Sequence, residues 1–392
     1  MKKIAKKVFV GMSGGVDSSV AAYLLKKQGY NVTGVFMRCY NLDGCSEKDA
    51  EDARRVAEHL KIPFYVWDFE KEYKKKVVDY MIRGYKSGIT PNPDVMCNRE
   101  IKFGLFLARA LKMGADYVAT GHYVRLRRKS DPNTPNHIRI PRKKDDSEHS
   151  DGFVGLGRYS LAIAKDPNKD QSYFLWTLTQ RQLQHCLFPI GDYLKPKVRE
   201  IARRAGLPTA DKKDSQGICF LGMVSMDEFL EKYIPKKKGD VLDAKGKKIG
   251  EHIGAHFYTI GQRQGVGNIK HQKGNQIHKP VYVSKKDVRK NVVVVEEEGS
   301  PALYRSVARL SDLNIINPIG PNRGKRTKVN VWTRVRYRQP LAPAVLEKSQ
   351  VLNSKRQTWK LVFKNPQKFV AEGQSAVFYK KNGEMLGGGI IV

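Results

Sequence analysis

The chain has 392 residues, of which 72 are Lys or Arg and 39 are Asp or Glu, so its formal net charge is +33. A chain of this length can bury more than one hydrophobic core, and we expect two or three domains. The charge indicates a polyanionic partner such as a nucleic acid, although a lineage with Lys-rich surfaces throughout would give the same balance.

Cysteine usage and hydropathy exclude several classes of protein. The cysteines are too few and too scattered for a disulfide framework, and no Cys-x-x-Cys pair is present for a zinc ribbon: they are Cys39, Cys45, Cys97, Cys186 and Cys219. No apolar run is long enough to span a bilayer, and the N-terminal lysines run directly into the first predicted strand without room for a signal peptide. We therefore expect a cytoplasmic protein that has no membrane partner.

Apolar runs alternate with helical patterns through the first third of the chain, which predicts an α/β fold. We expect buried strands at 8–12, 32–37, 63–68 and 117–120, and helices at 16–28, 47–60, 71–86 and 98–112. This order is typical of a doubly wound, mostly parallel sheet that binds ligands at the carboxyl ends of its strands.

The turn between the first strand and the first helix is Ser13-Gly14-Gly15-Val16-Asp17-Ser18-Ser19. Its glycines allow a close approach to a bulky anion, at which the N–H groups of the helix start would point. Asp17 beside a phosphate makes chemical sense mainly as a ligand of Mg²⁺. The spacing is neither Gly-x-x-x-x-Gly-Lys-Ser/Thr nor Gly-x-Gly-x-x-Gly, but the loop resembles that of the ATP pyrophosphatases, which implies adenylation. The alternative is a Gly-rich turn with a Ser/Asp helix cap.

Two irregular segments each contain a cysteine. Residues 86–98 place Cys97 just before a predicted helix, where a thiol has a lowered pKa, and Asp94 three residues earlier could serve as acid or base toward a substrate. The alternative is a capped loop with a buried, inert cysteine. Residues 209–220 place Cys219 among lysines, which favour its thiolate.

The composition changes twice more along the chain. Polar and charged residues predominate from 127 to 151, which predicts an exposed and mobile insertion. From about residue 288, strand-like runs predict a small antiparallel barrel or sandwich; they are 291–295, 328–338, 358–363, 375–379 and 389–392. We therefore expect a catalytic domain at 1–224, a small central domain at 225–287 and a C-terminal β-barrel at 288–392.

Residues 331–338 alternate basic side chains with apolar or aromatic ones. A strand there would present Arg334, Arg336 and Arg338 on one face, which could grip a phosphate backbone and stack on an unpaired base. The alternative is a solvated face of an edge strand.

A series of motifs across nearly the whole chain resembles those of the bacterial tRNA-specific 2-thiouridylases, which are tRNA-uridine 2-sulfurtransferases of the ATP pyrophosphatase (PP-loop) superfamily. The motifs occur in the order of that family, at 11–19, 91–98, 120–123, 169–173, 214–220, 336–339 and 373–377. Two departures are visible. The insertion at 127–151 is longer than expected, and Gln216 stands where a small hydroxyl residue is expected.

The resemblance implies ATP-dependent 2-thiolation of the wobble uridine (position 34) in the tRNAs for glutamate, glutamine and lysine. ATP, with Mg²⁺, adenylates the C2 oxygen, and a persulfide on Cys219 delivers sulfur to C2. Cys97 helps to release that sulfur, which leaves a transient disulfide between the two cysteines. The persulfide sulfur would come from a sulfur-relay protein or a cysteine desulfurase.

The resemblance also implies roles for individual residues. The ATP contacts are Gly11, Met12, Ser13, Gly14, Gly15, Val16, Asp17, Ser18, Met37 and Gly121, and the target base meets Asn92, Pro93 and Asp94. The tRNA contacts are His122, Lys169, Asp170, Gln171, Arg336, Tyr337 and Gln374. Cys97, Cys219 and Asp94 are the expected catalytic residues.

Two other classes of protein share part of this pattern. Another ATP pyrophosphatase, such as an argininosuccinate synthetase, a GMP synthetase or the enzyme that thiolates tRNA position 8, would not need both cysteine loops. A non-catalytic RNA-binding protein with a degenerate nucleotide fold would not need Asp17, Cys97 and Cys219.

Overall fold

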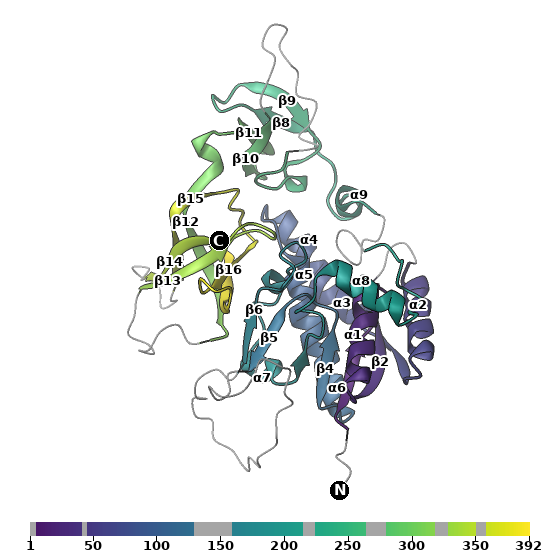
Figure 1. Ribbon diagram of the computed structural model, residues 1–392. Coiled ribbons are helices and arrows are strands. Elements are labelled where there is room, and N and C mark those ends of the chain that lie inside the picture. The colour runs from purple at the N-terminus through teal and green to yellow at the C-terminus, as the bar shows by residue number, and fades with distance from the viewer. Residues whose placement is uncertain are drawn as a thin grey trace.

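The computed structural model describes residues 5–40, 45–128, 159–214, 224–263, 280–317, 328–349 and 358–392. These residues form an N-terminal α/β unit, a middle unit built on a four-stranded sheet, and a C-terminal closed barrel. In Figure 1 the middle unit lies at the top, the barrel at the left and the α/β unit below and to the right. The predicted fold class is confirmed.

The α/β unit is built on a parallel sheet with the strand order β3-β2-β1-β4-β7. Its strands are β1 (Lys7–Gly11), β2 (Asn31–Arg38), β3 (Phe64–Asp68), β4 (Tyr117–Thr120) and β7 (Cys186–Leu187). The strand order changes direction at β1, whose neighbours are β2 and β4. The loop after β1 therefore lies at the switch point where such sheets bind ligands.

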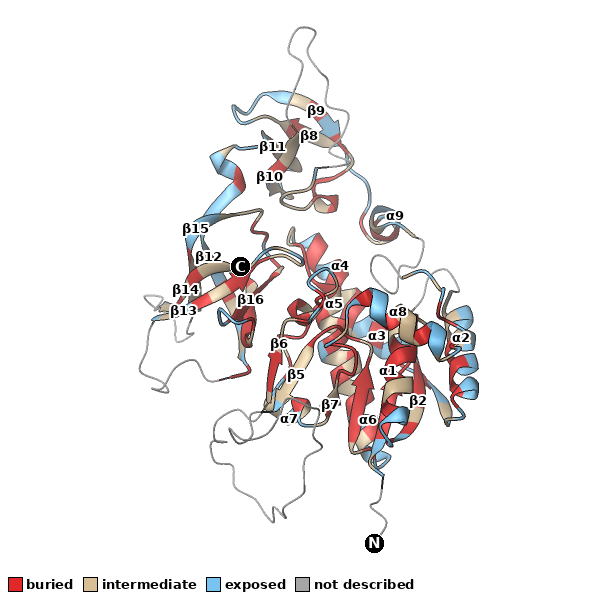
Figure 2. Ribbon diagram, in the orientation of Figure 1, coloured by how far each residue is buried: buried red, intermediate tan, exposed pale blue. Residues whose placement is uncertain are grey.

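Alternate residues of β1 face opposite sides of the sheet, as the period of a strand requires. Val8 and Val10 enter one apolar core together with α1 (Val16–Lys27), α2 (Cys45–His59) and α8 (Lys195–Arg204). Phe9 enters a second core against two longer helices. These helices are α3–η1–α4 (Glu70–Tyr73, Lys74–Val78 and Asp79–Lys86) and α5–η2–α6 (Pro93–Met96, Cys97–Phe106 and Leu107–Lys112). Figure 2 shows the central strands buried between these two layers.

The helix expected from residue 98 begins earlier, at Pro93. The Asn92 side chain accepts a hydrogen bond from the Val95 N–H (3.2 Å), so Asn92 is the N-cap. Proline is well suited to the first helical position because no N–H is required there. Asp94 and Cys97 therefore lie within the helix, whereas the sequence placed them in the preceding loop.

The middle unit contains the four-stranded sheet β10-β11-β8-β9. Its elements are α9 (Met226–Glu231), β8 (Gly239–Leu242), β9 (Lys248–His252), η4 (Ala255–Phe257), β10 (Val281–Asp287) and β11 (Val292–Glu297). The strand expected at 291–295 was assigned to the C-terminal barrel, and this assignment is wrong. β11 pairs with β10 and runs parallel to β8, so it completes the middle sheet.

The barrel closes in the strand order β12-β15-β14-β13-β16-β17. After η5 (Pro301–Leu303), its strands are β12 (Tyr304–Ile315), β13 (Lys328–Arg334), β14 (Ala342–Ser349), β15 (Thr358–Lys368), β16 (Ser375–Tyr379) and β17 (Met385–Ile391). Leu310, Leu346 and Phe378 are among the side chains that fill its core.

The expected strand at 328–338 is too long, and its three-arginine face does not form. β13 ends at Arg334, because the Gln339 side chain accepts the Val335 N–H (3.1 Å) and the Gln339 N–H donates to the Arg336 carbonyl (3.2 Å). Arg338 has a φ of +64°, in the left-handed region and outside the extended range of a regular strand. The chain therefore turns where alternation predicted a continued strand.

Shorter elements complete the described part of the chain: β5 (Arg125–Arg128), β6 (Tyr159–Ala162), η3 (Ser172–Phe174) and α7 (Gln180–Leu183). Of the predicted insertion at 127–151, all but the first two residues lie outside the described part. None of the described helices is long and apolar enough to cross a membrane.

Candidate active site

The loop after β1 folds back onto the first turn of α1. The Ser13 N–H donates to Ser18 Oγ (3.1 Å), and the hydroxyls of Ser18 and Ser19 donate to the Gly15 carbonyl (3.1 and 2.8 Å). Gly14 has a φ of +71°, and a Cβ there would lie 2.3 Å from a backbone oxygen of α2, so only glycine fits. No described side chain caps the first turn of α1. This backbone arrangement is typical of phosphate-binding loops.

Residues from three strand ends meet at this loop. A Cβ on Gly11 would lie 3.0 Å from Met37 Cε, and a Cβ on Gly121 would lie 2.6 Å from the Ser18 backbone nitrogen. The structure thus brings together the ends of β1, β2 and β4, as the sequence analysis expected. Contact between these residues and ATP stays a prediction.

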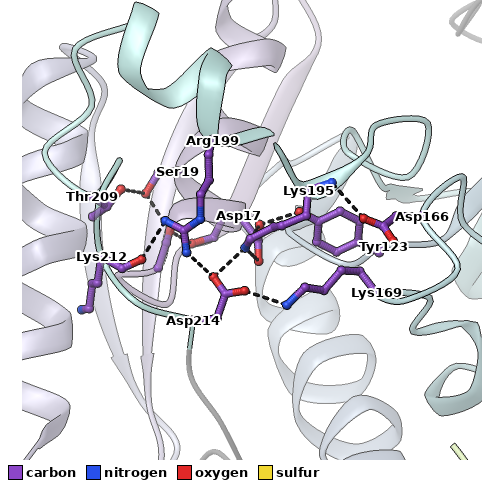
Figure 3. Close-up of polar contacts among 12 residues, drawn as sticks. Asp17, Ser19, Tyr123, Asp166, Lys169, Lys195, Arg199, Thr209, Lys212 and Asp214 are labelled. Carbon is purple, nitrogen blue, oxygen red and sulfur yellow. Dashed lines mark hydrogen bonds and ion pairs between the residues drawn. The ribbon is translucent and has the colours of Figure 1, made fainter. Parts of the chain in front are cut away.

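The Asp17 carboxylate contacts two side chains from distant segments (Figure 3). It accepts hydrogen bonds from the Tyr123 hydroxyl (2.8 Å) and from Lys195 Nζ (2.8 and 2.9 Å). Burial and the neighbouring Asp17 carboxylate raise the pKa of Tyr123, so this hydroxyl keeps its proton. Asp17 is therefore held by one neutral donor and one cation.

Asp214 gathers the cations around Asp17. It forms ion pairs with Lys169 (2.7 Å), Lys195 (2.8 Å) and Arg199 (2.6 Å). Burial acts to raise the pKa of Asp214, but hydrogen bonds from Lys169 and Lys195 outweigh it and lower the pKa to about 2. Lys195 bridges Asp17 and Asp214, so the two carboxylates share one network (Figure 3).

The segment after β4 connects this network to the helix that contains Cys97. His122 Nδ1 pairs with Thr120 Oγ1 (2.8 Å), and the imidazole packs on Phe103 of that helix with ring centroids 6.0 Å apart. The hydroxyl of Tyr123, the next residue, donates a hydrogen bond to Asp17 beside the phosphate loop. One short segment therefore contacts both the phosphate loop and the cysteine helix.

The ionisable groups near the start of the cysteine helix are largely enclosed. Burial raises the pKa of Asp94, against an opposing effect of Lys102. Burial, and then Lys102, lower the pKa of His122 well below its usual value, so its imidazole is neutral at physiological pH. Cys97 is 4% exposed. Cys219 lies outside the described residues, so its position relative to Cys97 stays a prediction.

The segment just before this helix is held by both other units. The Thr90 N–H donates to the Glu372 carbonyl (2.8 Å) and Gln374 Nε2 donates to the Thr90 carbonyl (3.0 Å), both from the barrel. From the middle unit, Thr259 Oγ1 accepts a hydrogen bond from Thr90 Oγ1 (3.2 Å). The position of Asn92 and Asp94 thus depends on all three units.

Comparison with known proteins places this arrangement in a family. Three family models match consecutive parts of the chain: the tRNA methyl transferase HUP domain (residues 6–223), the tRNA methyl transferase PRC-barrel domain (227–297) and the aminomethyltransferase beta-barrel domain (308–391). Proteins named tRNA-specific 2-thiouridylase MnmA from Nitrosomonas europaea and Streptococcus thermophilus are 41% and 43% identical to it. Each alignment covers 98% of this chain, and 98% and 95% of the respective relative.

The chain belongs to the tRNA-specific 2-thiouridylase family. A further relative, named tRNA-specific 2-thiouridylase MnmA 2 from Aliarcobacter butzleri, is 42% identical over 98% of both chains. Membership of the family confirms the resemblance inferred from the motifs.

Some residues that the family motifs assign to tRNA are committed to other contacts. Asp170 is 3% exposed and binds Arg334 of the barrel (2.9 Å), so its carboxylate is out of reach of tRNA in this conformation. His122 is buried as well. Lys169 pairs with Asp214, and Gln171 accepts the Tyr123 N–H (2.9 Å).

Arg336, Tyr337 and Gln374 retain partly exposed side chains. Arg336 donates to the Ile260 carbonyl (2.8 Å), and burial lowers its pKa. Tyr337 packs on Phe174 with ring centroids 4.6 Å apart. Their contact with tRNA stays a prediction.

Sequence reasoning missed the Asp17 partners, which are Tyr123, Lys195 and, through Lys195, Asp214. Tyr123 and Asp214 were included in family motifs, but no role followed from their position. Lys195 and Arg199 are four residues apart, which places them on one face of α8. In a chain this basic, two cations on one helix face do not by themselves indicate a binding site.

Proposed function

We propose that this chain catalyses ATP-dependent 2-thiolation of the wobble uridine, position 34, of tRNA. As a member of its family it is a tRNA-uridine 2-sulfurtransferase. The observation that carries the detailed proposal is the segment 120–123, in which His122 packs on the cysteine helix while Tyr123 binds Asp17 of the phosphate loop. An adenylating loop and a thiol on adjoining elements suit a reaction that activates an oxygen and replaces it with sulfur.

The C2 oxygen must be activated, because oxide is a poor leaving group. The reaction also requires a sulfur nucleophile and a second thiol that breaks the persulfide bond. The uracil C2 oxygen attacks the α-phosphorus of ATP, the bond to the β-phosphate breaks, and pyrophosphate leaves with the electron pair. The outer sulfur of a Cys219 persulfide then bonds to C2, and AMP departs with the oxygen. The Cys97 thiolate attacks the inner sulfur, so the S–S bond of the persulfide breaks and a Cys97–Cys219 disulfide forms. A thiol reductant must restore both thiols before the next cycle.

The groups near the phosphate loop suit a nucleotide that arrives with Mg²⁺. The described residues include no cluster of three or more His, Cys, Asp or Glu that could hold a resident metal ion. Mg²⁺ in nucleotide sites needs only one or two carboxylates in addition to the phosphates, and Asp17 is the carboxylate at the loop. We assign ATP to the loop, Met37 and Gly121, and the target base to the start of the cysteine helix at Asn92, Pro93 and Asp94.

The partners follow from charge and from the family. A net charge of +33 favours a polyanion such as tRNA, and we propose the glutamate, glutamine and lysine acceptors in the cytoplasm. The persulfide sulfur would come from a relay protein or a cysteine desulfurase. We place the catalytic domain at about 1–224 and extend the middle domain to Glu297, because β11 pairs with β8.

Serine variants of the two cysteines test the proposal, since each should fail at a different step. Cys219→Ser should accept no labelled sulfur from a desulfurase relay. Cys97→Ser should accept it but fail to form 2-thiouridine over repeated turnovers. Sulfur labelling and intact-mass analysis of the protein measure sulfur acceptance, and nucleoside analysis of the tRNA measures 2-thiouridine formation.

Cys39→Ser is the matched control, because Cys39 is a half-buried thiol outside both motifs, and it should retain both steps. Full thiolation by the Cys219→Ser protein would refute the persulfide mechanism.

A further inference from the structure

Three cations from two segments converge beside the phosphate loop. Lys195 and Arg199 extend from α8, and Lys169 extends from the loop before η3. All three bind Asp214 at 2.6–2.8 Å, and Lys195 also binds Asp17. In the ion pairs of Figure 3 these three side chains share two carboxylates, Asp17 and Asp214, whereas Asp166, also drawn there, accepts the Lys195 backbone N–H (2.9 Å).

We propose that Lys169, Lys195 and Arg199 form a binding site for the pyrophosphate part of ATP, for which Asp214 competes as an internal anion. The proposal rests on the proposed adenylation and extends it to residues outside the Ser-Gly-Gly loop. Lys195 is the central member, because it lies between Asp17 and Asp214.

The donor set fits a phosphate chain better than it fits one carboxylate. Asp214 has two oxygens for three cationic side chains, whereas two linked phosphates offer several anionic oxygens at similar spacing. The contacts can exchange, because the Asp214 and Lys169 side chains are 27% and 33% exposed. Water and phosphate oxygens can therefore replace the carboxylate at Lys169, and Lys195, whose side chain is only 10% exposed, keeps its ion pair with Asp17 (2.8 Å).

The cluster also fits the charge that adenylation generates. When the C2 oxygen of the uracil attacks the α-phosphorus, negative charge accumulates on the departing β-phosphate. Cations fixed beside that group stabilise the transition state more than the ground state, and fixed donors of this kind make large contributions to catalysis. Asp17 keeps Lys195 in place (2.8 Å) when the phosphates displace Asp214.

Direct binding of inorganic pyrophosphate and of ATP, measured by calorimetry, tests the cluster independently of thiolation. Lys195→Met and Lys169→Met should each weaken pyrophosphate binding by about 10- to 100-fold, as expected for the loss of a charged hydrogen bond. Asp214→Asn should strengthen it, because the competing anion is removed. Affinity for tRNA should change little in Lys195→Met and Asp214→Asn.

Lys197→Met is the matched control, because Lys197 lies on the same helix, is exposed and pairs with Glu200 (3.0 Å). It should bind pyrophosphate like the parent protein. Equal pyrophosphate affinity in Lys169→Met, Lys195→Met and Lys197→Met would overturn the inference, and unchanged melting temperatures would rule out misfolding as a cause of weaker binding. A parent protein that binds neither ATP nor pyrophosphate would refute the proposed function itself.

Discussion

Two aspartates of this protein each accept several hydrogen bonds, but their surroundings differ. Asp170 accepts the N–H groups of Ala164 and Ser172, the Ser172 hydroxyl and the guanidinium of Arg334, all at 2.9–3.2 Å. Its side chain is 2% exposed. Asp214 binds three cationic side chains and is 27% exposed.

The difference shows which contacts can take part in a reaction cycle. Removing one partner of a buried ion pair leaves an uncompensated charge, whereas water replaces a lost partner at an exposed pair. Asp170 joins the α/β unit to the barrel through Arg334, and exchange there would be costly. Asp214 can give up its cations at little cost, as a site that binds and releases phosphates requires.

The largest expected effect is on stability, and it tests this comparison directly. Asp170→Ala should lower the free energy of unfolding by about 3–5 kcal/mol, because Arg334 would remain buried without its carboxylate. Asp214→Ala should lower it less, by about 1–2 kcal/mol, because its side chain is partly exposed and water screens its ion pairs. Urea unfolding monitored by fluorescence and by circular dichroism measures both.

The double variant Asp170→Ala/Arg334→Met provides the control. Removing both charges should recover part of the stability lost in Asp170→Ala, although the two backbone N–H groups stay without their acceptor. An equal decrease in the free energy of unfolding in Asp170→Ala and Asp214→Ala would contradict the comparison, because it would show that exposure does not determine the cost of losing each carboxylate.

Sequence alone predicted the elements of the α/β unit well because their signals are local. Strand periodicity, the two glycines after β1 and the cap residues all act within a few positions. The position of the phosphate loop therefore followed from a short stretch of chain, whereas Met37 and Gly121 were expected beside it because of the family resemblance.

The errors concern partners that are distant in sequence. Lys195 and Asp17 are 178 positions apart, and Arg334 and Asp170 are 164 positions apart. The local pattern at 331–338 indicated a strand with three exposed arginines, but nothing in it identified Asp170 as the partner of Arg334. The strand β11 was found correctly, yet its membership of the middle sheet depends on pairing with β8, about 50 residues earlier.

A third charged side chain sharpens the comparison, because its partner is a backbone carbonyl, whereas Asp170 and Asp214 have charged partners. Lys286 Nζ donates to the Tyr258 carbonyl (2.6 Å), and burial lowers its pKa to about 8, against an opposing effect of Glu372. Between about pH 8 and pH 10 the unfolded chain retains a proton that the folded chain has lost. Stability therefore rises with pH in this window, by about 1–2 kcal/mol.

Urea unfolding at several pH values across that window gives the free energy of unfolding of the parent protein and of Lys286→Met. The variant should lack this contribution to the rise, whereas Lys285→Met, at an exposed neighbouring position, should keep it. The same pH dependence in the parent and in Lys286→Met would assign the titration to another group.

The smallest effect concerns three arginines, at the end of β13 and in the turn after it, which differ in exposure. Arg334 is buried on Asp170, Arg336 is half-buried on the Ile260 carbonyl, and Arg338 is exposed beside the Tyr337 ring (5.2 Å). If the barrel binds tRNA as proposed, only side chains free to reach phosphates should contribute to the salt dependence of binding. Each phosphate neutralised contributes roughly 0.7–0.9 to the slope of log affinity against log salt.

Arg338→Ala should therefore flatten this slope by about one unit, and Arg336→Ala should flatten it less, because its guanidinium already donates to a carbonyl. Titration of a cognate tRNA at several salt concentrations gives the slope for each variant. Lys381→Ala, at an exposed position on another loop of the barrel, tests whether any surface cation would have the same effect. A larger change in Arg336→Ala than in Arg338→Ala would mean that the turn rearranges on binding and releases the half-buried arginine. Exposure in the free protein would then be the wrong guide to which cations meet the RNA.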